Sequence, residues 1–350
     1  MQEEPNSAPW VLWGIRAAAL AVALGALLLT AGRVRAVEAG DTVIPMGRAV
    51  GIKLFSDGVM VVGLAEVDTA SGGSAAPARS CGLQEGDIIT HINSEEVDSI
   101  EEVQSILQNV GDADMSIRAR RDGQELQVTA HAVQCSADGS YKLGAWIRDS
   151  MAGIGTLTFY DPESQVFGAL GHAVSDVDTA QLMPLQSGSI LYAQVEDVQK
   201  GQAGAPGELH GTFQTDRDLG ELSANTTGGL FGTLTDASLV QGLQPIPVAS
   251  RDEVHTGPAV IRSNIAGDTV EEYEVEITHI YPESGDSNRD LMLTVTDPRL
   301  LEATGGIVQG MSGSPLIQDG KLVGAVTHVL VNDPTQGYGI LMEHMLDAAP

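Results

Sequence analysis

Hydrophobic and polar positions follow three successive patterns along this 350-residue chain. Residues 10–31 are almost uninterruptedly apolar, with Arg16 as the one charged residue among them. Residues 47–131 combine short strand-like stretches with one stretch of helical period, and beyond residue 139 a two-residue alternation dominates. The pattern therefore predicts an N-terminal apolar segment, a small α/β module and a large β-rich body.

The apolar segment is long enough for a membrane-spanning helix when it is counted from Trp10 to Leu29, with Arg16 near an interface. The same residues also fit a signal peptide with a small-residue cleavage site at residues 34–36, although the acidic start of the chain fits a basic n-region poorly. We expect residues 1–35 to be a retained anchor, and in either case we expect the remainder to be exported.

The small module contains one well-marked helix, from Ser99 to Val110. Ser99 and Glu102 form a possible capping box at its start, and Gly111 ends it. Its apolar residues fall on one face, as in a helix that packs on a sheet. The predicted strands around this helix are residues 50–54, 59–64, 115–119 and 125–131.

The β-rich body shows the clean alternation of half-buried strands. In the segment 273–280, Tyr273, Val275 and Ile277 share one face while glutamates occupy the other. We therefore predict a β-barrel or a pair of barrels for residues 140–350. The other strands expected there are residues 154–160, 165–170, 190–195, 259–265 and 291–296.

The composition of the chain disfavours several classes of function. The chain has 47 acidic and 18 basic residues, a net charge of −29, so nucleic acid is a poor candidate partner. Cys81 and Cys135 are too few for a four-cysteine zinc site, and no CxxC or HExxH motif occurs. We expect no metal and no cofactor; whether the two cysteines pair or stay separate thiols is open.

The strongest chemical signal is the stretch Gly310-Met311-Ser312-Gly313-Ser314-Pro315. A serine between two glycines at a tight turn can project its hydroxyl, while neighbouring N–H groups remain able to bind an anion. A strand, the hairpin turn Asp319-Gly320 and a second apolar strand follow, a run similar to that after the nucleophile of trypsin-like proteases. The alternative for the tetrapeptide alone is a bulged turn in a glycine-rich β protein.

A serine nucleophile needs a base, usually an imidazole oriented by a carboxylate. His172 directly follows a predicted strand in the apolar run "GALGHAV", although such a histidine is also often structural. His328 is better explained as a hairpin residue, and His344 as part of the terminal amphipathic segment.

Asp297 is the candidate carboxylate, because it ends a predicted strand upstream of Ser312. It also precedes Pro298, which fits an N-cap with proline at the first helical position equally well. Both roles stay open at this point. Competing carboxylates are Asp176, Asp178 and Asp333.

The module with "GLQEGDIITHINSEEV" before a helix and a hairpin resembles a bacterial PDZ domain, which we place at residues 45–133. The resemblance implies binding of an extended peptide or C-terminus by strand addition, with a backbone loop for the carboxylate. By resemblance this loop is Arg48-Ala49-Val50-Gly51. A purely structural module is the alternative.

The passages "FYDPESQVFGALGHAVSD", "VQKGQAGAPGE" and "VTDPRLLEATGGIVQGMSGSPLIQDGKLVGAVTHVLVNDPTQGYGI", behind a PDZ-like module, resemble the stage IV sporulation protein B family of serine peptidases. The resemblance implies His172 as general base, Asp297 as its carboxylate and Ser312 as nucleophile, with the Gly310 and Ser312 N–H groups as oxyanion donors. The order His, Asp, Ser is that of chymotrypsin-like proteases. One departure is that Asp297 lies only 15 residues before Ser312.

The same resemblance implies a biological setting. Family members act between the two membranes around a developing spore, cleave themselves, and cleave a membrane-tethered regulator so that a sigma factor is activated. We therefore expect a membrane-anchored extracytoplasmic serine endopeptidase whose partner is a protein substrate at a membrane. The alternative is an inactive PDZ scaffold that binds or shields membrane-protein partners.

Overall fold

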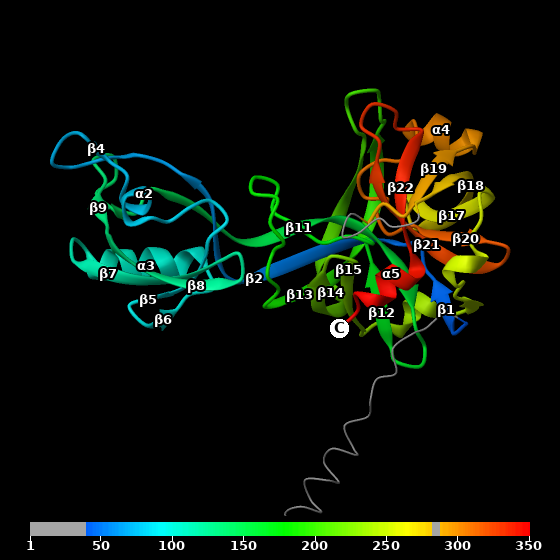
Figure 1. Ribbon diagram of the computed structural model, residues 1–350, viewed down its shortest axis with the longest axis horizontal. Helices are drawn as coiled ribbons and strands as arrows, with labels where there is room; N and C mark the ends of the chain where they lie inside the picture. The colour runs from blue at the N-terminus through cyan, green and yellow to red at the C-terminus, as the bar shows by residue number, and fades with distance from the viewer. Residues whose placement is uncertain (1–39, 282–287) are drawn as a thin grey trace, which may run out of the picture. The chain divides into compact units, whose positions relative to one another are not determined.

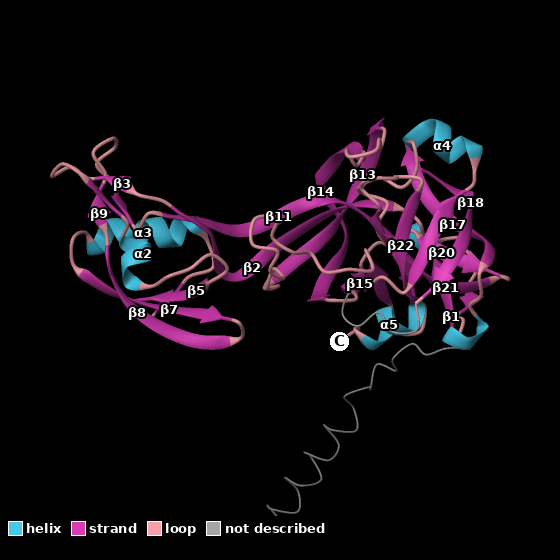
Figure 2. Cartoon of the chain, turned by 45° about the horizontal axis from the view of Figure 1, so that its top comes forward, coloured by secondary structure: helices cyan, strands magenta, loops and turns pink. Residues whose placement is uncertain are grey.

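The computed structural model describes residues 40–281 and 288–350 (Figure 1). Strands make up most of its regular structure, and the helices are few and short (Figure 2). The prediction of a mainly β protein is therefore confirmed. The predicted anchor, residues 1–35, lies outside the described residues, and among the described residues no helix is long and apolar enough to cross a membrane.

Six strands of the first half of the body hydrogen-bond in a ring. The ring closes at β2, which pairs with β11 along one edge and with β13 along the other. Large apolar side chains such as Phe167 and Leu157 fill its interior. In ring order the strands are β2 (Ala49–Leu64), β11 (Ala145–Tyr160), β12 (Val166–Ala169), β15 (Gly229–Leu234), β14 (Glu208–Thr226) and β13 (Ser187–Gln199).

The second half forms a closed six-stranded barrel with its own core. In β18, Tyr273, Val275 and Ile277 are buried while the glutamates between them are exposed, so the predicted alternation is confirmed. In barrel order the strands are β17 (Gly257–Ala266), β18 (Thr269–Ile280), β19 (Leu291–Val295), β22 (Gln336–Leu341), β21 (Lys321–Val329) and β20 (Pro315–Gln318).

Short elements complete the body. Two strands extend the first sheet beyond β11, where β1 pairs with β11 and β16 pairs with β1. The α-helices are single short pieces, of which α4 begins after Asp297 and α5 directly follows β22. The bounds are β1 (Thr42–Pro45), β16 (Ile246–Pro247), η1 (Ala237–Val240), η2 (Arg251–Glu253), α4 (Pro298–Thr304) and α5 (Met342–Asp347).

The PDZ module is built between the two long strands β2 and β11. Its helix α3 has the predicted capping box of Ser99 and Glu102 and packs its apolar face into a separate core. Cys81 and Cys135 are both free thiols in this module. Its elements are β3 (Val67–Asp68), β4 (Ser74–Ala75), α2 (Pro77–Cys81), β5 (Ile88–Ile92), β6 (Glu95–Glu96), α3 (Ile100–Val110), β7 (Asp114–Arg121), β8 (Gln124–His131), β9 (Val133–Gln134) and β10 (Tyr141–Lys142).

The structure corrects the expectation of a carboxylate-binding loop at Arg48–Gly51. Ala49, Val50 and Gly51 lie in β2, where Val50 is paired with Gly155 on one side and Tyr192 on the other. Their backbone groups are therefore already used in the sheet, and Val50 is fully buried in the first barrel. The physical reason is that an apolar run that is buried on its side-chain face and paired on both edges is a barrel strand, not a ligand loop.

Candidate active site

Ser312 lies in the turn between α4 and β20, and two glycines fix the shape of this turn. Gly310 and Gly313 have φ of +96° and +94°, which side chains rarely adopt. A β-carbon at Gly313 would lie 2.1 Å from the carbonyl oxygen of Thr156, so only glycine fits there. The turn is also bound to the first barrel, because the Thr156 N–H donates to the Ser312 carbonyl (3.0 Å) and its hydroxyl to the Gly310 carbonyl (2.7 Å).

The N–H groups of this turn divide into two sets. Met311 N–H donates to the Val308 carbonyl, and Gly313 N–H donates to the Val326 carbonyl. Among the described residues, no acceptor faces the N–H of Gly310 or that of Ser312. Two unused backbone donors beside a serine hydroxyl are what an oxyanion hole requires.

A sharp turn at the end of β12 positions His172. Leu170 and Gly171 both have positive φ, 69° and 70°, and for Leu170 this is a strained conformation of the kind found at functional sites. The ring nitrogen Nδ1 lies 2.8 Å from the Ala173 carbonyl oxygen. Because a carbonyl only accepts, Nδ1 carries the proton and Nε2 carries the lone pair. Burial of the ring lowers the pKa of His172 below its ordinary value of 6.5.

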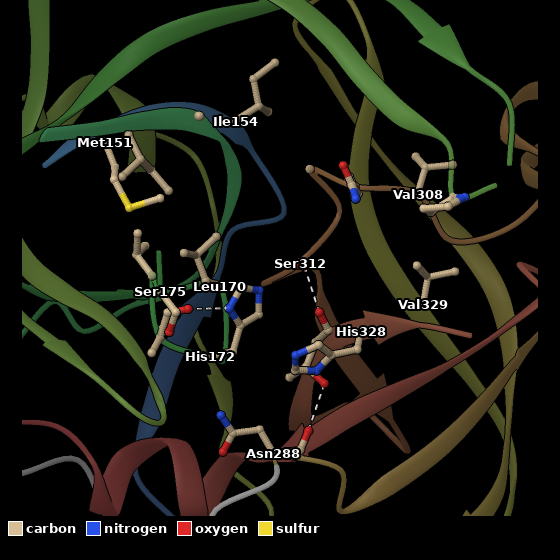
Figure 3. A pocket seen from close by; sticks show the side chains of 18 of the residues that line it. Met151, Ile154, Leu170, His172, Ser175, Asn288, Val308, Ser312, His328 and Val329 are labelled. Atoms are coloured by element: carbon tan, nitrogen blue, oxygen red, sulfur yellow. Dashed lines mark hydrogen bonds between the residues drawn. The ribbon is translucent and has the colours of Figure 1, made fainter. Parts of the chain in front are cut away.

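His172 and Ser312 line the same cavity, of about 830 Å³ (Figure 3). They come from different barrels, which places the cavity at the junction of the two. The Ser312 hydroxyl donates to the Thr327 carbonyl (2.8 Å), so its proton is directed away from His172 here.

His328 also lines this cavity, although the sequence pattern indicated only a hairpin residue. Its ring centroid lies 5.0 Å from that of His172, with the rings tilted by 36°, and its Nδ1 is buried without a partner among the described residues. Burial, and after it the nearby His172 and Arg289, lower the pKa of His328 to about 4. His328 is therefore neutral near pH 7. The one available signal was a histidine in an otherwise apolar strand.

Asp297 is the N-cap of α4. Its carboxylate accepts from the Arg299 N–H (2.8 Å), pairs with the Arg299 guanidinium (2.8 Å) and accepts from the Glu274 N–H (3.3 Å). The hydrogen bonds from Arg299 lower the pKa of Asp297 to about 2. Asp297 is not among the residues that line the cavity, and in the described part of the chain it has no bond to His172. Of its two predicted roles, the structure displays the helix cap.

The competing side chains are also engaged elsewhere. Asp176 is buried and paired with Arg148, Asp178 is paired with the same arginine, Asp333 accepts from Thr335, and His344 lies 2.9 Å from Asp290. Within the described residues, no aspartate or glutamate lines the cavity, and no cluster of three metal-ligating side chains occurs.

The two barrels and the cavity between them fit a serine peptidase, with a PDZ-like module inserted between β2 and β11. The family model for the SpoIVB peptidase S55 matches residues 139–346, more than half of the chain, and a PDZ domain model matches residues 70–121. The chain therefore belongs to the SpoIVB peptidase S55 family, carries a PDZ domain and is a serine endopeptidase. The sequence-based family assignment is confirmed.

Solved structures give weaker likenesses. The PDZ domain of an SdrC-like protein from Listeria monocytogenes is 21% identical, covering 26% of this chain and 87% of that one, with a TM-score of 0.22. The inactive form of the Rv3671c protease of M. tuberculosis is 14% identical, covering 57% of this chain and 82% of that one, with a TM-score of 0.31. No curated protein matches this chain.

Proposed function

We propose that this peptidase is chymotrypsin-like and uses Ser312 as nucleophile and His172 as general base. The observation that carries the proposal is that the first barrel and the second barrel each contribute one of these side chains to a single cavity. The protonated Nδ1 of His172 leaves Nε2 as the basic nitrogen, and its lowered pKa keeps the imidazole neutral at pH 7.

In the proposed reaction, the Ser312 hydroxyl leaves the Thr327 carbonyl and attacks the substrate carbonyl carbon while Nε2 of His172 takes its proton. The Gly310 and Ser312 N–H groups bind the resulting oxyanion, each contributing on the order of 3 kcal/mol. The Ala173 carbonyl, which accepts from Nδ1, stabilises the imidazolium. The imidazolium then protonates the leaving amine, and the same base activates the water that releases the acyl group.

The biological role that we propose rests on family resemblance and on the apolar N-terminal segment. Residues 1–35 anchor the enzyme at the extracytoplasmic face of a membrane, between forespore and mother cell. There it cleaves itself and a membrane-tethered regulator, which leads to sigma factor activation. Tethering enzyme and substrate to one membrane raises their effective concentration. The PDZ domain binds a peptide or C-terminus of the substrate by strand addition.

The test is to express the full chain beside a candidate membrane-tethered substrate, with Ser312→Ala and His172→Ala variants. We expect substrate cleavage and self-cleavage by the native chain, and neither by the variants. A fluorophosphonate probe should label the native chain alone. Equal labelling of the His172→Ala variant would refute the base, and absence of labelling in the native chain would favour the inactive PDZ scaffold.

A further inference from the structure

The direction in which a substrate crosses the cavity follows from proton transfer. The leaving amine must receive its proton from Nε2 of His172, so the part of the substrate after the scissile bond lies on the His172 side of Ser312. The residue that supplies the carbonyl therefore extends to the opposite side of Ser312. Figure 3 shows Val308 and Val329 on that side, with Ser312 between them and His172.

Aliphatic residues close in sequence to Val308 and Val329 also line the cavity. Ile307 and Val308 precede the nucleophile turn and are almost fully buried, at 2% and 1% exposure. Val329 ends β21, and Val331 follows two residues later and is 47% exposed, so it is the most accessible to solvent of these four lining residues. We call the space lined by Ile307, Val308, Val329, Val331 and Pro206 the acyl-side pocket.

The described residues that line the cavity offer a charged substrate side chain no oppositely charged partner. Its lining residues in the described part of the chain include no aspartate, glutamate, lysine or arginine. The polar side chains of the lining, such as Gln309 and Thr327, are uncharged or, like His328, neutral near pH 7. Moving an unpaired charge from water into such a site is costly, whereas burying an aliphatic side chain there is favourable.

We propose that the acyl-side pocket selects an aliphatic residue, such as valine, leucine, isoleucine or methionine, immediately before the scissile bond. The inference rests on the proposed roles of Ser312 and His172, because these fix the side of the cavity that holds the acyl residue. Beyond the proposed function, it specifies the kind of residue that precedes the peptide bond the enzyme cleaves.

The experiment compares kcat/KM of the full chain in detergent for peptides that differ only at this residue. Leucine and valine peptides should be cleaved about 100-fold faster than lysine or aspartate peptides. In the Val331→Asp variant, kcat/KM for the leucine peptide should fall about 10-fold and kcat/KM for the lysine peptide should rise, because a carboxylate then lines the pocket. Val329→Asp supplies the same test deeper in the pocket.

The matched control is Val177→Asp, which adds the same charge at a valine that is 82% exposed and does not line the cavity. It should keep the native preference. A native enzyme that prefers lysine or aspartate, or Val331→Asp and Val329→Asp variants with unchanged preference, would overturn the acyl-side pocket. Fluorophosphonate labelling separates this from failure of the proposed function: a labelled enzyme with another preference refutes only the pocket, whereas an unlabelled one refutes the nucleophile.

Discussion

The two barrels position Ser312 and His172, the side chains to which we assign catalytic roles, by different means. The second barrel presents Ser312 on a turn whose shape is set by Gly310 and Gly313 within four residues of sequence. The first barrel presents His172 after a strained Leu170, and the ring is held by the Ala173 carbonyl and packed against His328. The proposed nucleophile therefore lies on a turn shaped mainly by two local glycines. The proposed base is also held locally by Ala173, but its ring contact with His328 comes from the other barrel and exists only in the assembled fold.

One strand joins the two arrangements. β11 begins in the PDZ module, where Ala145 pairs with Leu64, and runs into the first barrel. Near its end, Thr156 binds the carbonyls of Gly310 and Ser312. The turn of the second barrel is thus anchored on the barrel that carries His172. Substitutions should separate the local contribution from the assembled one.

The largest effect is expected for Ser312→Ala. Removing the nucleophile should lower kcat by on the order of 10⁶, as for serine peptidases in general, with little change in melting temperature. The measurement is peptide cleavage together with thermal unfolding of the same preparation. Cleavage by this variant at more than a few per cent of the native rate would show that another residue is the nucleophile.

A second large effect is expected for Gly313→Ala, which breaks the local geometry of the turn. The new β-carbon would meet the Thr156 carbonyl at 2.1 Å, so the turn must move away from β11 and activity should fall at least about 100-fold. The matched control is Gly320→Ala, a hairpin glycine with φ of +75° and nothing within 4 Å of its β-carbon. The control should lose only about 1 kcal/mol of stability and keep its activity. Equal activity losses in both variants would contradict the close contact.

An intermediate effect is expected at His328, which tests the assembled side. His328→Phe keeps a ring against His172 and should retain most of kcat, while His328→Ala removes that ring and should lower kcat about 10-fold with KM nearly unchanged. The measurement is the separate determination of kcat and KM. If the Phe variant loses as much activity as the Ala variant, polarity rather than packing is what His328 contributes.

The smallest effect is expected for Asp297→Asn. Asparagine also caps helices, so the free energy of unfolding of the variant should fall by about 1 kcal/mol or less. Its activity should stay within about 2-fold of the native value. Because the pKa of folded Asp297 is lowered to about 2, its stabilising contribution is present above pH 4 and is lost as the pH falls toward 2. The difference in free energy of unfolding between the native chain and the variant should therefore be smaller at pH 2.5 than at pH 7. A loss of kcat by orders of magnitude at unchanged stability would instead assign Asp297 to a catalytic triad.

The sequence reveals what short segments determine. The Ser312 turn, the capped helix α3 and the alternation of β18 are each encoded within a dozen residues, and each was predictable. The position of His328 beside His172 depends on the register between barrels, which no local pattern carries. For Arg48–Gly51 the pattern predicted a strand from residue 50 while the resemblance implied a loop, and pairing with β11 and β13 decides for the strand. Asp297 followed by Pro298 fits two roles locally, and only its contact with Arg299 displays one of them.

The pH dependence of fluorophosphonate labelling tests the central claim most directly, since it follows activation of Ser312 without a substrate. The base acts in its neutral form, so a pKa lowered by burial moves the acid limb to lower pH. In the native chain we predict that the labelling rate falls as the pH is lowered, with a midpoint below pH 6.5. In the His172→Ala variant the labelling rate should be about 10⁴-fold lower. An unchanged rate and midpoint in that variant would contradict the account.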